Sequence, residues 1–91
     1  MAMMTVFLKI DEDRVVQALQ EAGEKLDSAE GEVVLDFSSV PRIDASGLMA
    51  MEEFAGKADD KGLKVALRGV NVSVYKVLKL VKLTSRFSFV N

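Results

Sequence analysis

Apolar residues follow a period of two in short segments and a helical period in longer ones, and the two patterns alternate along the chain. Residues 4–10 place Val6, Leu8 and Ile10 on one side of an extended segment, which predicts a first strand. Asp11 or Asp13 is then expected to cap a helix that ends before Gly31. Spacings of four, three and four give that helix one apolar stripe, formed by Val15, Leu19, Ala22 and Leu26.

The second strand is predicted over residues 32–37, where every position from Val33 onward is apolar except Asp36. Such a segment is typical of a central strand covered by helices on both faces. A connection containing Pro41 leads into a helix from about Gly47 to about Asp60. We expect Gly62 to take the left-handed conformation that ends this helix.

The remaining elements repeat the alternation. Residues 63–67 predict a third strand, Asn71 is expected to cap a last helix, and residues 87–91 predict a short edge strand. In the last helix the inward positions are expected to be Val74, Val77, Leu78 and Val81, and the outward ones Lys76, Lys79 and Lys82. This order predicts an α/β fold with a mostly parallel sheet of about four strands and helices packed against it.

Length and composition restrict the function. With 91 residues, 49% of them apolar, residues 1–91 are expected to form a single domain. Histidine and cysteine are absent, which excludes thiol nucleophiles, imidazole bases and Cys/His zinc sites. No phosphate-binding loop, dinucleotide fingerprint or nucleophile elbow occurs in the sequence. We therefore expect a protein that is not an enzyme and has no catalytic residue, cofactor or bound metal.

Charge argues against nucleic acid as a partner, because the net charge is −2 rather than strongly positive. No apolar run approaches the ~20 residues of a spanning helix, and the start of the chain lacks an export signal. A cytoplasmic protein without direct membrane insertion is expected. The charge is nevertheless uneven, since the first half of the chain is acidic and the second half is basic.

The row of Lys76, Lys79 and Lys82 has two interpretations. A lysine row on a helix is usually a solvated face, because lysine is seldom buried. Alternatively, the row attracts an acidic partner or anionic lipid headgroups.

Candidate chemistry concentrates at the corner between the second strand and the following helix. There Asp44, Ala45, Ser46 and Gly47 reach a helix start, whose free amide groups favour an anion or a hydrogen-bonding oxygen. The simpler alternative is that Asp44 or Ser46 only caps the helix.

The helix after the corner offers a candidate docking surface. Met49 and Ala50 lie away from the predicted apolar stripe of Leu48, Met51 and Ala55. They leave an apolar patch beside Glu52, Glu53 and Phe54. Methionine adapts to varied partner shapes. The alternative is that these side chains complete the core or are singly exposed to solvent, since scattered exposed apolar residues are ordinary.

Three segments together resemble the STAS domain, the fold of bacterial anti-sigma factor antagonists. They are VVLDFSSVPRIDASGL (33–48), DDKGLKVALRGVN (59–71) and VYKVLKLVKL (74–83), and the resemblance covers about residues 32–87. It implies a non-catalytic module whose partner, a kinase that is also an anti-sigma factor, binds at the corner and the following helix. The expected contact residues are Asp44, Ala45, Ser46, Gly47, Met49, Ala50, Glu53 and Phe54.

The sequence departs from the family pattern at the phosphorylation site. The residue after the corner aspartate, usually phosphorylated in the family, is Ala45, and Ser46 is the only hydroxyl left at the corner. Either Ser46 is a displaced acceptor, or the partner binds without a phosphorylation switch. The additional N-terminal strand of the family is also missing from the sequence pattern, so the domain is expected to lack it.

A second resemblance involves Gly69, Val70, Asn71 and Tyr75. These residues are similar to the STAS subunit of the bacterial phospholipid-transport ABC complex, which implies the ATPase subunit of a transporter as the partner. Asn71 and Tyr75 are equally explained as a helix cap and a half-buried aromatic residue.

Overall fold

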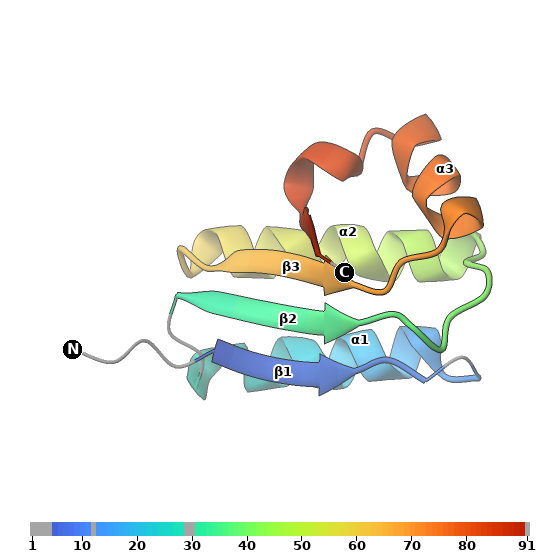
Figure 1. The fold of residues 1–91 in the computed structure, drawn as a ribbon. Coiled ribbons are helices and arrows are strands. Elements are labelled where there is room, and N and C mark those ends of the chain that lie inside the picture. The colour runs from blue at the N-terminus through green and yellow to red at the C-terminus, as the bar shows by residue number, and fades with distance from the viewer. Residues whose placement is uncertain (1–4, 12, 29–30, 91) are drawn as a thin grey trace.

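The computed structural model describes residues 5–11, 13–28 and 31–90. Their order along the chain is β1 (Thr5–Lys9), α1 (Val15–Glu24), a 3-10 turn (Lys25–Ser28), β2 (Glu32–Asp36), α2 (Ala45–Asp60), β3 (Lys64–Arg68), α3 (Val72–Leu80), a second 3-10 turn (Thr84–Arg86) and β4 (Ser88–Val90). The strands form one parallel sheet in the order β1-β2-β3-β4 (Figure 1). This confirms the predicted α/β fold, including the short final strand.

The sheet register explains the core. Leu8, Leu35 and Leu67 stand side by side across three strands, because each is the Cα partner of the next. In β2 the alternate residues Val33 and Leu35 are completely buried. Leu19 and Ala22 of α1 are also buried, as their spacing predicted. The strand and helix periods therefore direct their apolar residues into one shared core.

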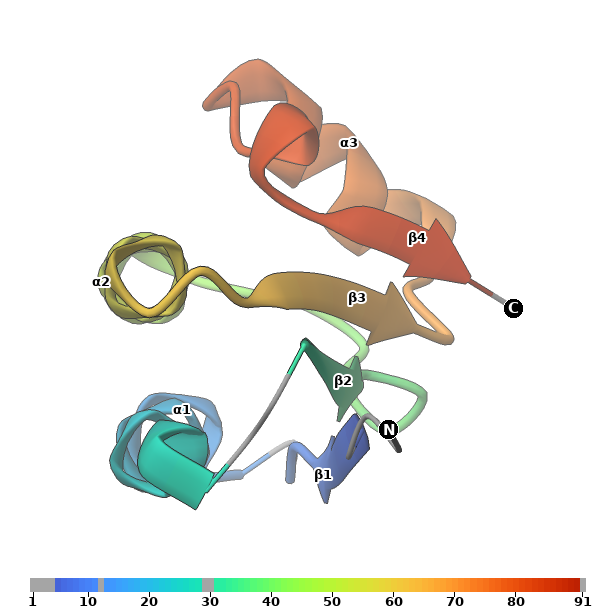
Figure 2. The same ribbon diagram turned by 90° about the vertical axis from the view of Figure 1, so that its left-hand side faces the viewer.

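The two long helices lie on the same face of the sheet, as Figure 2 shows. When parallel strands lie side by side in chain order and all their crossovers have the same hand, the connecting helices lie on one face of the sheet. The prediction that β2 is covered on both faces is therefore wrong. On the opposite face Val34 is only partly buried, and its register partner Phe7 is 51% exposed.

The helix starts differ from one another. Asn71 caps α3, as predicted. Asp44 caps α2, which was one of the two alternatives for the corner. The prediction that Asp11 or Asp13 caps α1 is wrong, because Arg14 occupies the N-cap position and makes no side-chain cap. Instead, the backbone N–H of Arg14 donates to the carbonyl oxygen of Asp11 in a turn, at 3.2 Å.

Two helix ends also bear on the predictions. Gly62 has the expected positive φ, 68°, and follows Lys61, the C-cap of α2. In contrast, α3 ends at Leu80, so Val81 is the C-cap and its side chain is 46% exposed. The prediction of an inward Val81 is wrong because the helical period no longer applies there. Among the described residues, no helix combines the length and apolar content needed to cross a membrane.

Candidate functional site

The corner between β2 and α2 is closed by Asp44. Its backbone is extended, with φ −99° and ψ −178°, and its carboxylate Oδ1 accepts a hydrogen bond from the N–H of Gly47 at 2.8 Å. The carbonyl oxygen of Asp44 also accepts from the N–H of Leu48, at 2.9 Å. Asp44 therefore acts as a structural cap that fixes the direction in which α2 leaves the corner.

Gly47 allows the loop to pack tightly on the first turn of α2. A Cβ atom at this position would lie 2.7 Å from Cγ1 of Ile43 and 3.4 Å from Oδ1 of Asp44. The first distance is too short for two carbon atoms, so only glycine fits against the Ile43 side chain. Gly47 is itself buried, and its contribution to the corner is its small size.

Asn71 joins the corner loop to α3. Its side-chain oxygen accepts from the N–H of Val74 at 2.8 Å, which caps α3. Its side-chain amide donates to the carbonyl oxygens of Val40, at 3.3 Å, and Pro41, at 3.0 Å. One side chain thus connects two segments that lie about thirty residues apart in the sequence.

The turn before the corner is held by Asp36 at the end of β2. The side chain of Ser38 and, with a smaller effect, its backbone N–H donate hydrogen bonds to the Asp36 carboxylate and hold the pKa of Asp36 below its ordinary value. The charges of Arg68 and Lys9 lower this pKa further. Gly69 packs beneath this turn with φ 72°, and a Cβ there would lie 2.8 Å from Cβ of Ser38. The turns after β2 and β3 are therefore in close contact.

The predicted contact residues divide into exposed and buried groups. The exposed ones are Asp44, Ala45, Ser46, Met49 and Glu53, and Met49 is 66% exposed. Gly47, Ala50 and Phe54 are buried instead, and only 2% of Phe54 is exposed. The prediction that Ala50 and Phe54 form part of a surface patch is wrong.

The reason for this error is the direction assigned to the apolar stripe of α2. The residues of α2 that are buried follow one another at spacings of three, one, three, one and three, which is a single helical stripe; they are Gly47, Ala50, Met51, Phe54, Ala55 and Ala58. Ala50 and Phe54 lie within this stripe, whereas Leu48, which the prediction placed in it, is only partly buried. The remaining surface of the first turns of α2 consists of Ala45, Ser46, Met49, Glu52 and Glu53, which we call the α2 surface.

An open groove of about 820 Å³ adjoins the corner. Its walls are the start of α1 and the loop from Pro41 to Asp44, with Arg14 and Arg42 among the lining residues. Sequence reasoning did not identify either arginine as a site residue. One signal for this groove was available in the sequence. Two parallel strands that are each followed by a turn and a helix bring the two helix starts to the same edge of the sheet.

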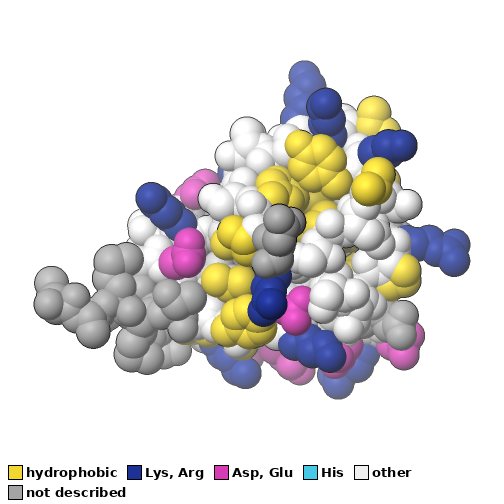
Figure 3. All heavy atoms as spheres, viewed as in Figure 1, with side chains coloured by type: hydrophobic (Ala, Val, Ile, Leu, Met, Phe, Trp, Pro, Cys, Tyr) yellow, Lys and Arg dark blue, Asp and Glu magenta, His cyan; other side chains and the backbone are white. Residues whose placement is uncertain are grey.

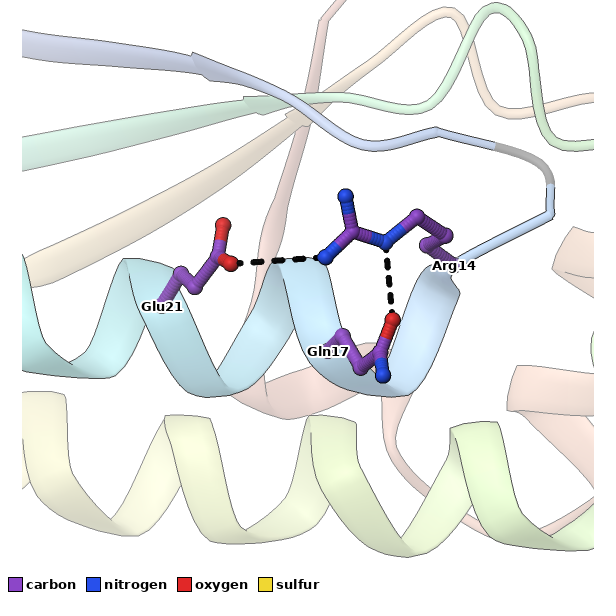
Figure 4. Close-up of polar contacts among 3 residues, drawn as sticks. All are labelled: Arg14, Gln17 and Glu21. Atoms are coloured by element: carbon purple, nitrogen blue, oxygen red, sulfur yellow. Dashed lines mark hydrogen bonds and ion pairs between the residues drawn. The ribbon is translucent and has the colours of Figure 1, made fainter.

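Arg14 is held along α1, as Figure 4 shows. Its Nε donates to Oε1 of Gln17 at 2.7 Å, and its Nη2 lies 3.6 Å from Oε1 of Glu21. Both contacts are within exposed parts of α1, so they orient the side chain with little gain in stability.

The second resemblance involves residues at the other side of Asn71. The rings of Tyr75 and Phe89 meet edge to face, with 5.1 Å between their centroids. They line a small hollow of about 220 Å³ together with Val70, Asn71, Val72 and Val90. The two explanations offered for Asn71 and Tyr75, a cap and a half-buried aromatic residue, agree with these contacts.

Comparison with protein families matches the STAS domain over residues 5–91. The chain belongs to the STAS domain family. The family resemblance predicted from the corner and the later glycine, strand and helix pattern is thereby confirmed. A search of curated proteins finds no match to this STAS domain.

Solved structures with a similar fold come from several proteins. One is a putative anti-sigma factor antagonist from Thermotoga maritima (20% identity, 96% of this chain and 79% of that one, TM-score 0.77). Another is a sulfate transporter family protein from Wolinella succinogenes (23% identity, 93% and 75%, TM-score 0.78). A third is RsbS from Moorella thermoacetica (20% identity, 98% and 84%, TM-score 0.76). At these identities the comparisons show that the STAS fold is shared.

Proposed function

We propose that this STAS domain is a non-catalytic regulatory module that binds a protein partner, an anti-sigma factor that is also a kinase, through the corner and the α2 surface. The observation that carries this proposal is the 66% exposure of Met49 directly beside Ser46 and Glu53. Methionine is flexible and polarisable and adapts to varied partner shapes, so Met49 beside this rigid turn is suited to a protein contact.

The corner is suited to binding because its shape is fixed before a partner arrives. Three contacts restrain the loop: the Asp44 cap, the close approach of Gly47 to Ile43 and the hydrogen bond from Asn71 to Pro41. A preorganised surface loses less conformational entropy on association than a flexible one. The groove beside Arg14 and Arg42 extends the surface that a partner can contact.

In this proposal, charge added at Ser46 would break the contact with the partner. Ser46 is exposed on the first turn of α2, next to Met49 on the same helix face. A phosphate there would add about −1.5 to −2 charge to a contact already carrying Glu52 and Glu53. Ala45 lacks a hydroxyl, so Ser46 is the acceptor in this proposal if the partner phosphorylates the corner.

The proposal is tested by affinity capture with three baits: the wild-type domain, Met49→Asp and Leu80→Ser. We expect mass spectrometry to identify an anti-sigma factor with a kinase domain on the wild-type and Leu80→Ser baits and not on Met49→Asp. Leu80 is an exposed apolar residue outside the α2 surface, so it controls for the loss of a surface hydrophobic group. Capture of the same kinase by Met49→Asp would contradict the proposal.

A second candidate is a STAS accessory subunit that binds the ATPase of a lipid-transport ABC complex. The observation that favours it is the surface formed by Asn71, Tyr75 and Phe89, which carries the second resemblance. The same capture separates the two candidates, because this one expects an ATPase subunit on the wild-type bait. Tyr75→Ala would then abolish capture and Met49→Asp would not.

A further inference from the structure

The final third of the chain carries positive charge alone. From Lys61 to Val90 the sequence contains no aspartate or glutamate, and its basic residues are Lys61, Lys64, Arg68, Lys76, Lys79, Lys82 and Arg86. Two of these are neutralised by acids from earlier segments, since Lys61 pairs with Asp27 and Arg86 with Asp59. The region around α3 therefore keeps a local excess of positive charge.

Two lysines of α3 and one just after the helix account for most of this excess. Lys76, Lys79 and Lys82 are exposed, and none forms an ion pair within residues 5–11, 13–28 and 31–90. Because the described residues do not pair with these lysines, their charges are free to act on an external anion.

Exposed apolar side chains lie on the same helix as two of these lysines. Val74 and Leu78 bury the inner side of α3, whereas Leu80 is 81% exposed and Val72 is 69% exposed. Helical spacing puts Val72, Lys76, Lys79 and Leu80 on one side, with Tyr75 at its margin, and we call this set the α3 outward face. The face combines protruding apolar groups with cations.

The shape and position of α3 favour a flat, deformable partner. Figures 1 and 2 show α3 at the β4 end of the sheet, away from α1. Over this end the space-filling view shows basic and apolar side chains intermingled (Figure 3). A protein would need a groove shaped to accept Val72 and Leu80, whereas a lipid interface accepts protruding apolar groups and attracts lysines.

We propose that the α3 outward face binds the surface of an anionic lipid bilayer. The lysines attract the headgroups, and Leu80 and Val72 enter the boundary between headgroups and acyl chains. The α3 outward face and the α2 surface share no residue, so this binding does not depend on the proposed regulatory contact.

Vesicle co-sedimentation tests the proposal. We expect the wild-type domain to sediment with vesicles of phosphatidylglycerol and phosphatidylcholine and not with phosphatidylcholine alone. Binding should fall as salt rises from 0.1 M toward 1 M, since the screening length shortens from about 10 Å to about 3 Å over that range. Absence of sedimentation with the anionic vesicles, or equal sedimentation with both, overturns the proposal.

Matched variants assign the binding to α3. Lys79→Glu should weaken vesicle binding by at least about fivefold, because each basic residue near such a surface contributes roughly that factor. Lys57→Glu makes the same charge change in the last turn of α2 and should retain more binding than Lys79→Glu. Leu80→Ser should weaken binding, and Met49→Ser, at the α2 surface, should not. The assignment to α3 is wrong if Lys79→Glu and Lys57→Glu weaken vesicle binding equally. It is also wrong if Leu80→Ser and Met49→Ser have equal effects.

An acidic protein is the competing occupant of the same face. Polyglutamate serves as its probe, in the same buffer and at the same salt concentration. If the domain binds polyglutamate and fails to sediment with anionic vesicles, the α3 outward face is a protein site and the lipid proposal is wrong. Vesicle binding that is retained by Met49→Asp while kinase capture is lost separates this proposal from the proposed function.

Discussion

The side-chain amide of Asn71 donates a hydrogen bond to the carbonyl oxygen of Pro41 at 3.0 Å. Through the same side chain, α3 receives its N-cap. The start of α3 and the loop that leads to the corner are therefore positioned by one residue. A residue that performs both roles should affect stability more than an ordinary cap.

Replacing Asn71 with Ala should lower the free energy of unfolding by about 1–2 kcal/mol, since it removes a cap and leaves the loop carbonyls without their donor. Urea denaturation followed by circular dichroism measures this change. Asn71→Asp keeps an acceptor for the N–H of Val74 and removes the donor, so its loss should be smaller. Equal stability of all three proteins would show that the bridge contributes nothing.

Gly47→Ala should destabilise the domain by about 1–3 kcal/mol, the usual cost of overpacking. The added Cβ would lie 2.7 Å from Cγ1 of Ile43. Gly56→Ala is the matched control in the same helix, because a Cβ there meets nothing within 4 Å. It should stabilise α2 by about 0.5–1 kcal/mol. The account of the corner fails if both variants change stability in the same direction.

Phe54 and Met49 should respond oppositely to truncation, although both were predicted to lie in one patch. Phe54→Ala should cost about 3–5 kcal/mol because it empties a core position. Met49→Ala should change the free energy of unfolding by less than about 0.5 kcal/mol, as exposed substitutions usually do. Thermal denaturation distinguishes them, and a large loss for Met49→Ala would place Met49 in the core.

The lowered pKa of Asp36 makes stability depend on pH in the acid range. Hydrogen bonds from Ser38 favour the ionised carboxylate in the folded state, so the unfolded state binds protons more readily. The stabilisation is present above the unfolded value of about 3.9 and is lost as pH falls through the lower folded value. Asp36→Asn should be less stable than the wild type at pH 6. The difference should shrink in urea titrations at successively lower pH, and a constant difference would contradict it.

Local signals in the sequence predict the elements and most of their caps. The alternation in β1 and the spacing of Leu19 and Ala22 in α1 depend on neighbours within a few residues, and both predictions are confirmed. Asn71 as a cap also follows from a short segment. The parallel sheet follows from the order of these elements.

The errors have two sources. Phe54 keeps the spacing of the buried stripe of α2, so its burial could be predicted from the sequence, and the error was to place the stripe through Leu48 instead. The groove beside Arg14 and Arg42 forms between segments about thirty residues apart, so a local pattern does not reveal it. The partial exposure of Val34 on the second face of β2 follows from both long helices lying on one face of the sheet, which the apolar pattern of that strand alone does not reveal.

The central claim is that Met49 and its neighbours on the α2 surface form the contact with a kinase that is also an anti-sigma factor. Isothermal titration of the captured kinase with wild type and Met49→Asp, both verified as folded by circular dichroism, tests it most directly. We expect the substitution to weaken binding by at least about tenfold, the effect of losing an interface residue worth 1.4 kcal/mol or more. Unchanged affinity of the folded Met49→Asp domain would show that the partner binds elsewhere.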